Sequence, residues 1–155
     1  MNDVAVGQPV ADFTLPSTAA EPFRLRAARG KPLVLYFYPR DNTPGCSLEA
    51  QDFQSLLPAF RRAGVRVCGI SRDSLAAHRK FCEKYGLGFE LLVDEDGKVC
   101  KLFDVIHEKN MYGRKVMGIV RSTFLIDAAG KLRQEWRKVK VAGHAAEVLE
   151  AAKML

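Results

Sequence analysis

The chain has 155 residues and a formal net charge of +6, with 48% hydrophobic and 27% charged residues. This length corresponds to one domain, and the composition is that of a globular protein with a substantial core, which excludes an intrinsically disordered chain. The longest apolar run, Leu33–Tyr38, is too short for a membrane-spanning helix, and Met1–Phe13 lacks the basic start and apolar block of a secretory signal. We therefore expect a cytoplasmic protein that does not enter a membrane.

The charge and the cysteines exclude further classes. The densest basic stretch, Lys131–Lys140, alternates charged with apolar residues as a half-exposed strand does, so no nucleic-acid partner is expected. Four cysteines, Cys46, Cys68, Cys82 and Cys100, are too few and too widely spread for a disulfide scaffold, and reduced thiols are expected. The lack of any Cys-x-x-Cys or His-x-x-x-His pair speaks against a structural zinc site.

Hydrophobic periodicity predicts alternating strands and helices. Two short segments come first, Ala11–Leu15 and Phe23–Leu25. The predicted strands that follow are Leu33–Tyr38, Val65–Ile70, Phe89–Val93, Gly118–Ile126 and Lys131–Val139. The predicted helices are Ser47–Arg62, Leu75–Tyr85, a short one at Val99–Phe103, and a final one with Ala145, Val148, Leu149 and Ala152 on one face.

Two local features qualify this pattern. Pro58 is expected to kink or shorten the first long helix, and residues His107–Gly113 are expected to form a loop. A β-α-β-α-β alternation followed by a hairpin and a final helix predicts an α/β protein with a mixed central sheet covered by helices on both faces. We interpret this as a thioredoxin-like fold.

The segment between the first buried strand and the helix after it carries the strongest chemical signal. It reads Pro-Arg-Asp-Asn-Thr-Pro-Gly-Cys-Ser-Leu-Glu from Pro39 to Glu49. Ligand sites of open α/β sheets lie at such strand ends. Cys46 falls at the helix start, where unpaired N–H groups and the helix dipole favour a thiolate. The alternative is a small buried filler residue or a helix cap, against which the Thr-Pro-Gly lead-in argues.

This segment resembles the peroxiredoxin motif Pro-x-x-x-Thr-x-x-Cys at Pro39, Thr43 and Cys46, and the wider stretch is similar to the bacterioferritin comigratory protein, or PrxQ, subfamily. Further matches extend along nearly the whole chain, at Phe13–Pro16, Gly69–Ser71, Phe81–Tyr85, Leu92–Asp94, Met111–Gly113 and Arg121–Asp127. The resemblance implies a thiol peroxidase that reduces hydrogen peroxide and organic hydroperoxides without metal, haem or flavin. Its cysteine would pass through a sulfenic acid and a disulfide.

The resemblance also implies roles for single residues. Cys46 would attack the peroxide, the Thr43 hydroxyl would donate a hydrogen bond to it, and Pro39 would shield the thiolate from water. The backbone N–H groups of Gly45 and Cys46 would complete the pocket. The family's arginine on a later strand corresponds to Arg121.

Arg121 is unusual in its own right because it interrupts an apolar strand. A buried guanidinium needs an anion to face, unless it lies at a strand end and reaches solvent. Glu49, one turn after Cys46, either orients this arginine or is a solvated acid favoured by the helix dipole.

The position of the resolving cysteine departs from the commonest pattern of the subfamily. Many members carry it five residues after the reactive cysteine, but Gln51 stands there. Other members carry it on the next long helix, where Cys82 lies 36 residues after Cys46. Cys82 is accordingly expected to form an intramolecular disulfide, which requires local unwinding and is then reduced by a thioredoxin-like thiol donor. The alternative is that Cys82 is a core residue, because it shares a helical face with His78 and Tyr85.

The remaining candidates are weaker. Cys68 is expected to be a core residue, and the role of Cys100 stays open, including that of an alternative resolving cysteine. His78, His107 and His144 share no spacing and are interpreted as ordinary surface or helix residues. Competing functions are a thiol-disulfide oxidoreductase, which the missing Cys-x-x-Cys disfavours, and a non-enzymatic binding module with a basic surface. A monomer is expected.

Overall fold

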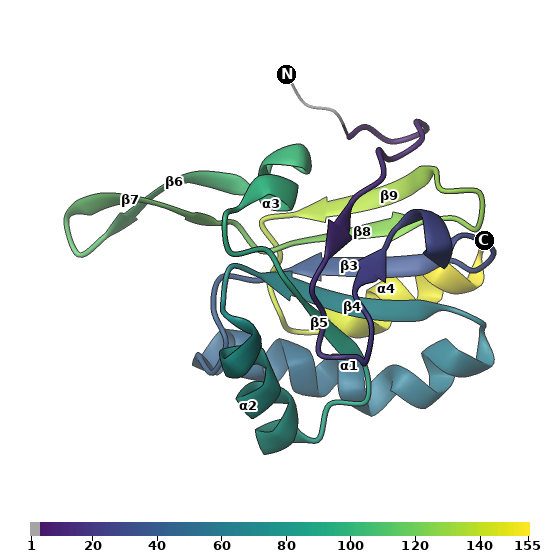
Figure 1. Cartoon of the computed structure of the whole chain (residues 1–155), viewed down its shortest axis with the longest axis horizontal. Helices are drawn as coiled ribbons and strands as arrows, with labels where there is room; N and C mark the ends of the chain where they lie inside the picture. The colour runs from purple at the N-terminus through teal and green to yellow at the C-terminus, as the bar shows by residue number, and fades with distance from the viewer. Residues whose placement is uncertain (1–3) are drawn as a thin grey trace.

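The computed structural model describes residues 4–155, so the first three residues of the N-terminal segment considered above lie outside it. Its central sheet has five strands in the order β5-β4-β3-β8-β9 (Figure 1). These are β3 (Leu33–Phe37), β4 (Arg66–Ser71), β5 (Glu90–Val93), β8 (Ser122–Ile126) and β9 (Leu132–Arg137). Strands β3, β4 and β5 are parallel, whereas β8 and β9 are antiparallel to their neighbours. The prediction of a mixed α/β sheet is confirmed.

Two apolar layers lie on opposite faces of this sheet. Helices α1 (Pro44–Arg62), α2 (Leu75–Tyr85) and α4 (His144–Lys153) cover one face, where Tyr36, Phe53 and Val148 pack together. The short strands β1 (Thr14–Leu15) and β2 (Phe23–Arg24), a 3-10 helix (Arg26–Ala28) and α3 (Lys98–Leu102) cover the other face. This arrangement follows from β3, whose five residues are all buried and alternate between the two layers.

Helix α1 differs from its prediction in where it begins and in the effect of Pro58. It begins at Pro44 rather than at Ser47, because proline suits the first helical position and Ser47 N already donates to Thr43 O at 2.8 Å. Cys46 therefore lies inside the first turn. Pro58 does not shorten the helix, which continues to Arg62.

Residues 106–119 form an antiparallel hairpin where a loop was expected for most of this stretch. Strands β6 (Ile106–Met111) and β7 (Arg114–Ile119) are joined at Tyr112 and Gly113, which have φ of 53° and 79°. Two positive-φ residues make a tight hairpin turn. The hairpin projects from the body of the protein (Figure 1), so its side chains do not show the apolar alternation of a half-buried strand.

The predicted strand Gly118–Ile126 is interrupted in the structure. Strand β7 ends at Ile119 and β8 begins at Ser122, which leaves Val120 and Arg121 between them. Arg121 thus lies at a strand junction instead of inside a strand. Within residues 4–155, no helix combines the length and the apolar character needed to cross a bilayer.

Candidate active site

Cys46 lies in the first turn of α1, at the carboxyl end of β3. Its side chain belongs to the apolar layer under the helices, and the residue is 2% exposed. The free N–H groups and the positive end of the helix dipole lie at this turn and favour negative charge on sulfur. The turn thus holds the Cys46 sulfur in a shielded position at the start of the helix.

Arg121 reaches this turn from 75 residues away. Its Nη2 donates to Cys46 Sγ at 3.4 Å, and its Nη1 donates to Glu49 Oε1 at 2.6 Å. Burial lowers the pKa of Arg121, but the negative charges of Glu49 and Cys46 outweigh this and the pKa is raised. Of the two readings of Arg121, the structure therefore shows the one in which it faces an anion.

Gly45 explains how the guanidinium comes so close. A Cβ atom built at Gly45 would lie 3.2 Å from Arg121 Nη2. Any larger residue would press against the guanidinium and push it away from Cys46.

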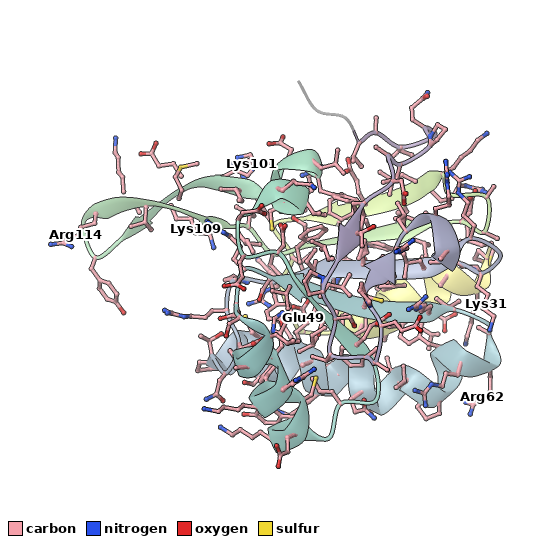
Figure 2. The ribbon with its side chains drawn as sticks, viewed as in Figure 1. Lys31, Glu49, Arg62, Lys101, Lys109 and Arg114 are labelled. Atoms are coloured by element: carbon pink, nitrogen blue, oxygen red, sulfur yellow. The ribbon has the colours of Figure 1, made fainter. Side chains whose placement is uncertain are left out.

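Glu49 is buried, with 1% of its surface exposed, and Figure 2 shows it in the interior of the protein. Burial raises its pKa from 4.5 to about 7, against the opposing effect of Arg121. Among residues 4–155, the buried side-chain atoms without a hydrogen-bond partner are Glu49 Oε2 and Tyr36 Oη. Burial and the charge of Glu49 raise the pKa of Tyr36. Glu49 is thus a buried partner of Arg121, and the reading as a solvated acid is wrong.

The raised pKa of Glu49 predicts a pH-dependent stability. Between pH 4.5 and 7 the folded protein holds a proton on Glu49 that the unfolded chain has released, so stability falls as pH rises through this window. The change is on the order of 2 to 3 kcal/mol. We expect Glu49→Gln to remove it, so that the free energy of unfolding of the wild type falls relative to the variant from pH 5 to pH 8. Urea denaturation across this range measures the free energy of unfolding of both proteins. If the wild-type value minus the variant value stays constant or rises with pH, the prediction is contradicted.

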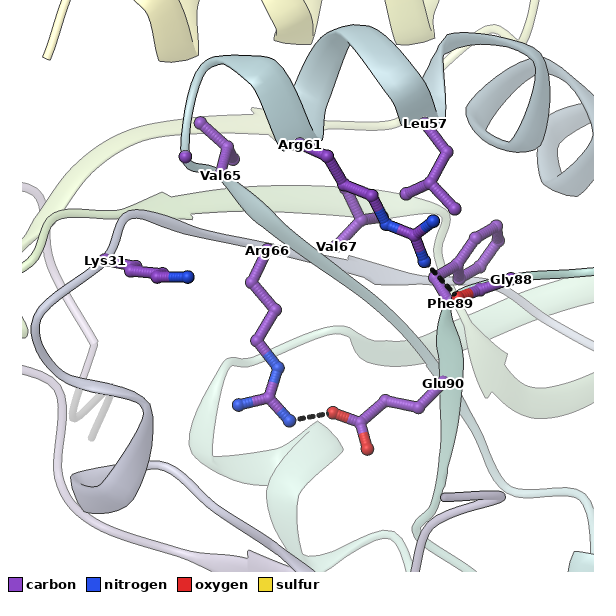
Figure 3. Close-up of a pocket in the computed structure, with 10 residues that line it drawn as sticks. Lys31, Leu57, Arg61, Val65, Arg66, Val67, Gly88, Phe89 and Glu90 are labelled. Atoms are coloured by element: carbon purple, nitrogen blue, oxygen red, sulfur yellow. Dashed lines mark hydrogen bonds and ion pairs between the residues drawn. The ribbon is translucent and has the colours of Figure 1, made fainter.

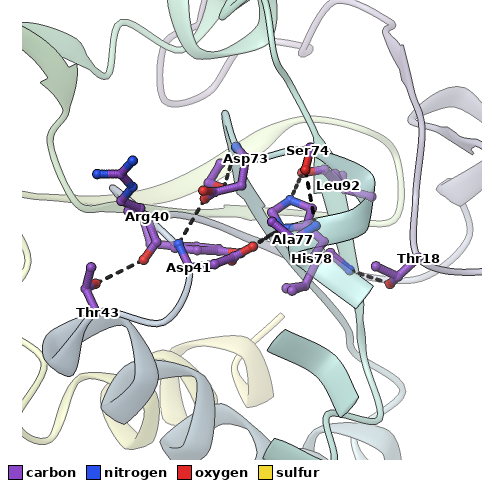
Figure 4. Close-up of polar contacts among 12 residues, drawn as sticks. Thr18, Arg40, Asp41, Thr43, Asp73, Ser74, Ala77, His78 and Leu92 are labelled. Carbon is purple, nitrogen blue, oxygen red and sulfur yellow. Dashed lines mark hydrogen bonds and ion pairs between the residues drawn. The ribbon is translucent and has the colours of Figure 1, made fainter. Parts of the chain in front are cut away.

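Thr43 and Pro39 flank the loop that leads into α1. The Thr43 hydroxyl donates to Arg40 O at 3.0 Å (Figure 4), and its side chain makes no helix-capping bond. Pro39 is half-buried between β3 and α1. Pro39, Thr43 and Cys46 thus lie on one stretch of chain that runs from the end of β3 into the first turn of α1, and the Thr43 hydroxyl is directed to the backbone.

The four cysteines are divided between the two faces of the sheet. Cys46 belongs to the layer under α1, α2 and α4, and the half-exposed Cys82 packs against the same layer. Cys68 and Cys100 are buried in the opposite layer. All four, which lie within residues 4–155, are free thiols. The core position of Cys68 is confirmed.

Burial raises the pKa of three of these thiols. For Cys82 the shift is partly offset by a hydrogen bond with Thr18. For Cys68 and Cys100 it is strengthened by the carboxylates of Glu90 and Asp94.

Two of the three histidines contradict the expectation of ordinary surface or helix residues. His78 is fully buried, with Nδ1 2.6 Å from Asp41 Oδ2 and Nε2 2.8 Å from Leu92 O. His144 is 6% exposed, its Nε2 lies 2.7 Å from Thr123 Oγ1, and burial lowers its pKa to about 4. His78 shares its helical face with Cys82, which was the one signal in the sequence that it points inward.

Asp41, Asp73 and His78 offer donor atoms within 4.8 Å of one another, the only such trio in the described part of the chain. The carboxylate oxygens of this trio already accept hydrogen bonds from protein groups. Asp41 N and Ser71 Oγ both donate to Asp73 Oδ2, and Tyr38 Oη donates to Asp41 Oδ1 at 2.5 Å. We therefore describe this trio as a hydrogen-bond network.

Lys109, a half-buried residue of β6, had no signal in the sequence analysis (Figure 2). Its side chain lies against Gly118 of β7. Burial and the positive charge of Arg121 lower its pKa, whereas Cys46 raises it. Lys109 therefore adds positive charge on the side of the site that faces the hairpin.

A surface pocket of about 440 Å³ lies away from these residues (Figure 3). It is lined by Leu57, Arg61 and Val65, at the far end of α1 from Cys46, and by Arg66 and Glu90, which form an ion pair. The chemically informative residues are elsewhere, so this pocket is not assigned to the active site.

Comparison with known proteins agrees with this geometry. Residues 6–135 match the model of the AhpC/TSA family. The chain is 52% identical to Peroxiredoxin Bcp of Xanthomonas campestris pv. campestris, over 99% of this chain and 97% of that protein. It is 46% identical to Peroxiredoxin Bcp of Bacillus subtilis, over 97% of this chain and 96% of that protein.

Solved structures similar to this chain are also peroxiredoxins. A structure of Xanthomonas campestris Peroxiredoxin Q matches with a TM-score of 0.90 and 50% identity, covering 99% of this chain and 98% of that one. Two variants of it replace a cysteine by serine, and another structure concerns the alkyl peroxide reduction activity of the bacterioferritin comigratory protein of the same organism. The chain therefore belongs to the AhpC/TSA family, among the Bcp/PrxQ peroxiredoxins, and is a thiol peroxidase.

Proposed function

We propose that the enzyme reduces hydrogen peroxide and organic hydroperoxides at Cys46. The thiolate would attack one peroxide oxygen, the O–O bond would break, and the products would be a sulfenic acid and an alkoxide or hydroxide that takes up a proton. The observation that carries this proposal is the contact of Arg121 Nη2 with Cys46 Sγ at the first turn of α1. The alkyl peroxide activity described for the Xanthomonas protein supports the substrate class.

The surrounding groups would stabilise the developing negative charge. Arg121, held by Glu49, presents its guanidinium beside the sulfur. The Thr43 hydroxyl lies at the helix entry and would turn from Arg40 O to the bound peroxide, while Pro39 would limit the access of water. The Arg121 guanidinium is in place before the reaction, so it costs no reorganisation at the transition state.

We further propose that Cys82 resolves the sulfenic acid. Cys82 packs on the same side of the sheet as Cys46, whereas Cys68 and Cys100 are separated from Cys46 by the sheet. In the two serine variants of the Xanthomonas protein the substituted cysteines are 36 positions apart, as Cys46 and Cys82 are here. The Cys46–Cys82 disulfide would then be reduced by a thioredoxin-like donor, with the enzyme acting as a monomer in the cytoplasm.

The experiment that tests this proposal is mass analysis after one equivalent of peroxide. Under non-reducing conditions the intact protein should lose two hydrogens, and peptide mapping should join Cys46 to Cys82. A map that joins Cys46 to Cys100, or no intramolecular bond, would overturn the resolving assignment. The same sample, supplied with thioredoxin and its reductase, should return to the dithiol form.

Replacing Cys82 separates the reduction of peroxide by Cys46 from the later formation and reduction of the disulfide. We expect Cys82→Ser to consume one equivalent of peroxide, to accumulate sulfenic or over-oxidised Cys46, and to lose turnover with thioredoxin down to background. The reason is that the sulfenic acid then lacks a thiol on its side of the sheet. Coupled NADPH oxidation and mass spectrometry measure these outcomes. Cys100→Ala is the matched control and should keep its turnover; loss of turnover in the control instead would contradict the prediction.

A further inference from the structure

The loop that carries the reactive site is tied to the helix that carries Cys82 by one buried contact. Asp41 stands in this loop between Pro39 and Thr43, and His78 stands one helical turn before Cys82 in α2. His78 Nδ1 lies 2.6 Å from Asp41 Oδ2, and the two side chains are 0% and 5% exposed (Figure 4). The segments bearing the two cysteines therefore meet at this pair.

The other polar atoms of the pair are also satisfied. His78 Nε2 lies 2.8 Å from Leu92 O, so each ring nitrogen faces an oxygen. The other Asp41 oxygen accepts from Tyr38 Oη, and Asp41 N donates to Asp73 Oδ2 at 2.9 Å. His78 is thus held by a residue of β5, and Asp41 is held by residues that lie just after the ends of β3 and β4.

A second, exposed tie joins the same two segments. Lys84 Nζ of α2 donates to Asn42 Oδ1 at 2.8 Å. Asn42 has a φ of 60°, in the left-handed region that asparagine adopts more readily than most other residues with a side chain. The loop is therefore fastened to α2, not merely adjacent to it.

The proposed chemistry joins two sulfurs that lie on the two segments fastened in this way. Cys46 Sγ accepts a hydrogen bond from Arg121 Nη2, whereas Cys82 lies half-exposed on α2, so the two sulfurs have different surroundings. In the resolving step the Cys82 sulfur attacks the sulfenic sulfur, the S–S bond forms, the S–O bond breaks, and the oxygen leaves as water with the thiol proton. A disulfide needs the two Cα atoms within about 7 Å. If the loop or α2 moves to bring the two Cα atoms within this distance, the contact between Asp41 and His78 has to lengthen.

We infer that Asp41 and His78 form a latch that holds the peroxide-reducing arrangement and limits the rate at which Cys82 reaches the sulfenic acid. This inference rests on the proposed resolving role of Cys82. His78 is here a positioning residue, because it acts through the loop and the helix and not on the sulfur. A closed latch also lengthens the life of the sulfenic acid, which exposes Cys46 to a second peroxide and over-oxidation.

The test measures the two steps separately in His78→Asn. With rapid mixing, the rate of peroxide consumption should stay within about twofold of wild type. Disulfide formation, followed by acid quench and mass analysis, should become about tenfold faster, equivalent to about 1.4 kcal/mol. The peroxide concentration that gives half over-oxidation should rise in proportion. His107→Asn, an exposed histidine of β6, is the control and should match the wild type in both steps.

A milder variant keeps the inference testable if the buried substitution impairs folding. Tyr38→Phe retains the buried ring and removes only the donor to Asp41, and it should accelerate disulfide formation by a smaller factor in the same direction. If His78→Asn folds and forms the disulfide at the wild-type rate or more slowly, the latch is refuted while the resolving role of Cys82 stands. If only Tyr38→Phe folds, the same result in that variant refutes the latch. If the wild type forms no Cys46–Cys82 bond, the resolving assignment and the latch both fall.

Discussion

Replacing Cys46 with serine is expected to abolish peroxide reduction while the fold is retained. Serine is close in size to cysteine, and the position lies in a first helical turn that serine tolerates well. A serine hydroxyl stays protonated at neutral pH, so it is too weak a nucleophile to attack the O–O bond. Removal of a covalent nucleophile costs on the order of 10⁴-fold or more in rate.

The measurement is the second-order rate of peroxide consumption by the purified variant, with circular dichroism as the check on folding. Cys68→Ala is the matched control, because Cys68 is buried in the layer on the opposite face of the sheet. The control should react at close to the wild-type rate. Peroxide reduction near the wild-type rate in Cys46→Ser would refute the assignment of the nucleophile.

The second large effect is expected for Arg121. Arg121→Ala removes the donor to Cys46 Sγ and should lower the second-order rate with peroxide by about 10²- to 10³-fold, as the loss of one preorganised donor does in other enzymes. The substitution also leaves the buried Glu49 without its partner. For this reason the double variant Arg121→Ala/Glu49→Gln should recover stability and yet remain slow.

Arg121→Lys sharpens the interpretation. A single ammonium cannot make the two separate contacts that Nη1 and Nη2 make with Glu49 and Cys46, so this variant should also be slower than wild type. Arg133→Ala, at an exposed arginine of β9, is the control for the loss of a surface charge. A rate for Arg121→Ala within about twofold of wild type would show that the guanidinium has no part in the chemistry.

These expectations rest on two kinds of information. The position of Cys46 at the start of a helix after a buried strand could be predicted from sequence, because strand periodicity, proline and the helix start act over a few residues. The order of strands and helices along the chain could be predicted for the same reason. The hairpin β6–β7 escaped prediction because it leaves the core, and burial is what produces an apolar pattern.

The contacts between distant segments were decided by the tertiary structure. Arg121 meets Cys46 and Glu49 only because β8 pairs with β3, which brings the residue before β8 to the end of β3. His78 was misjudged because a histidine in a helix has the same local pattern whether its imidazole meets water or a buried carboxylate such as Asp41.

Sequence by itself determined the fold class, the family resemblance and the reactive turn of this protein. Tertiary structure alone decided which cysteines share a face of the sheet, placing Cys82 with Cys46 and separating Cys68 and Cys100 from them. The physical reason is the range of the interactions. Backbone conformation and amphipathic patterning are set by near neighbours, whereas electrostatic pairing and burial depend on which elements the sheet brings together.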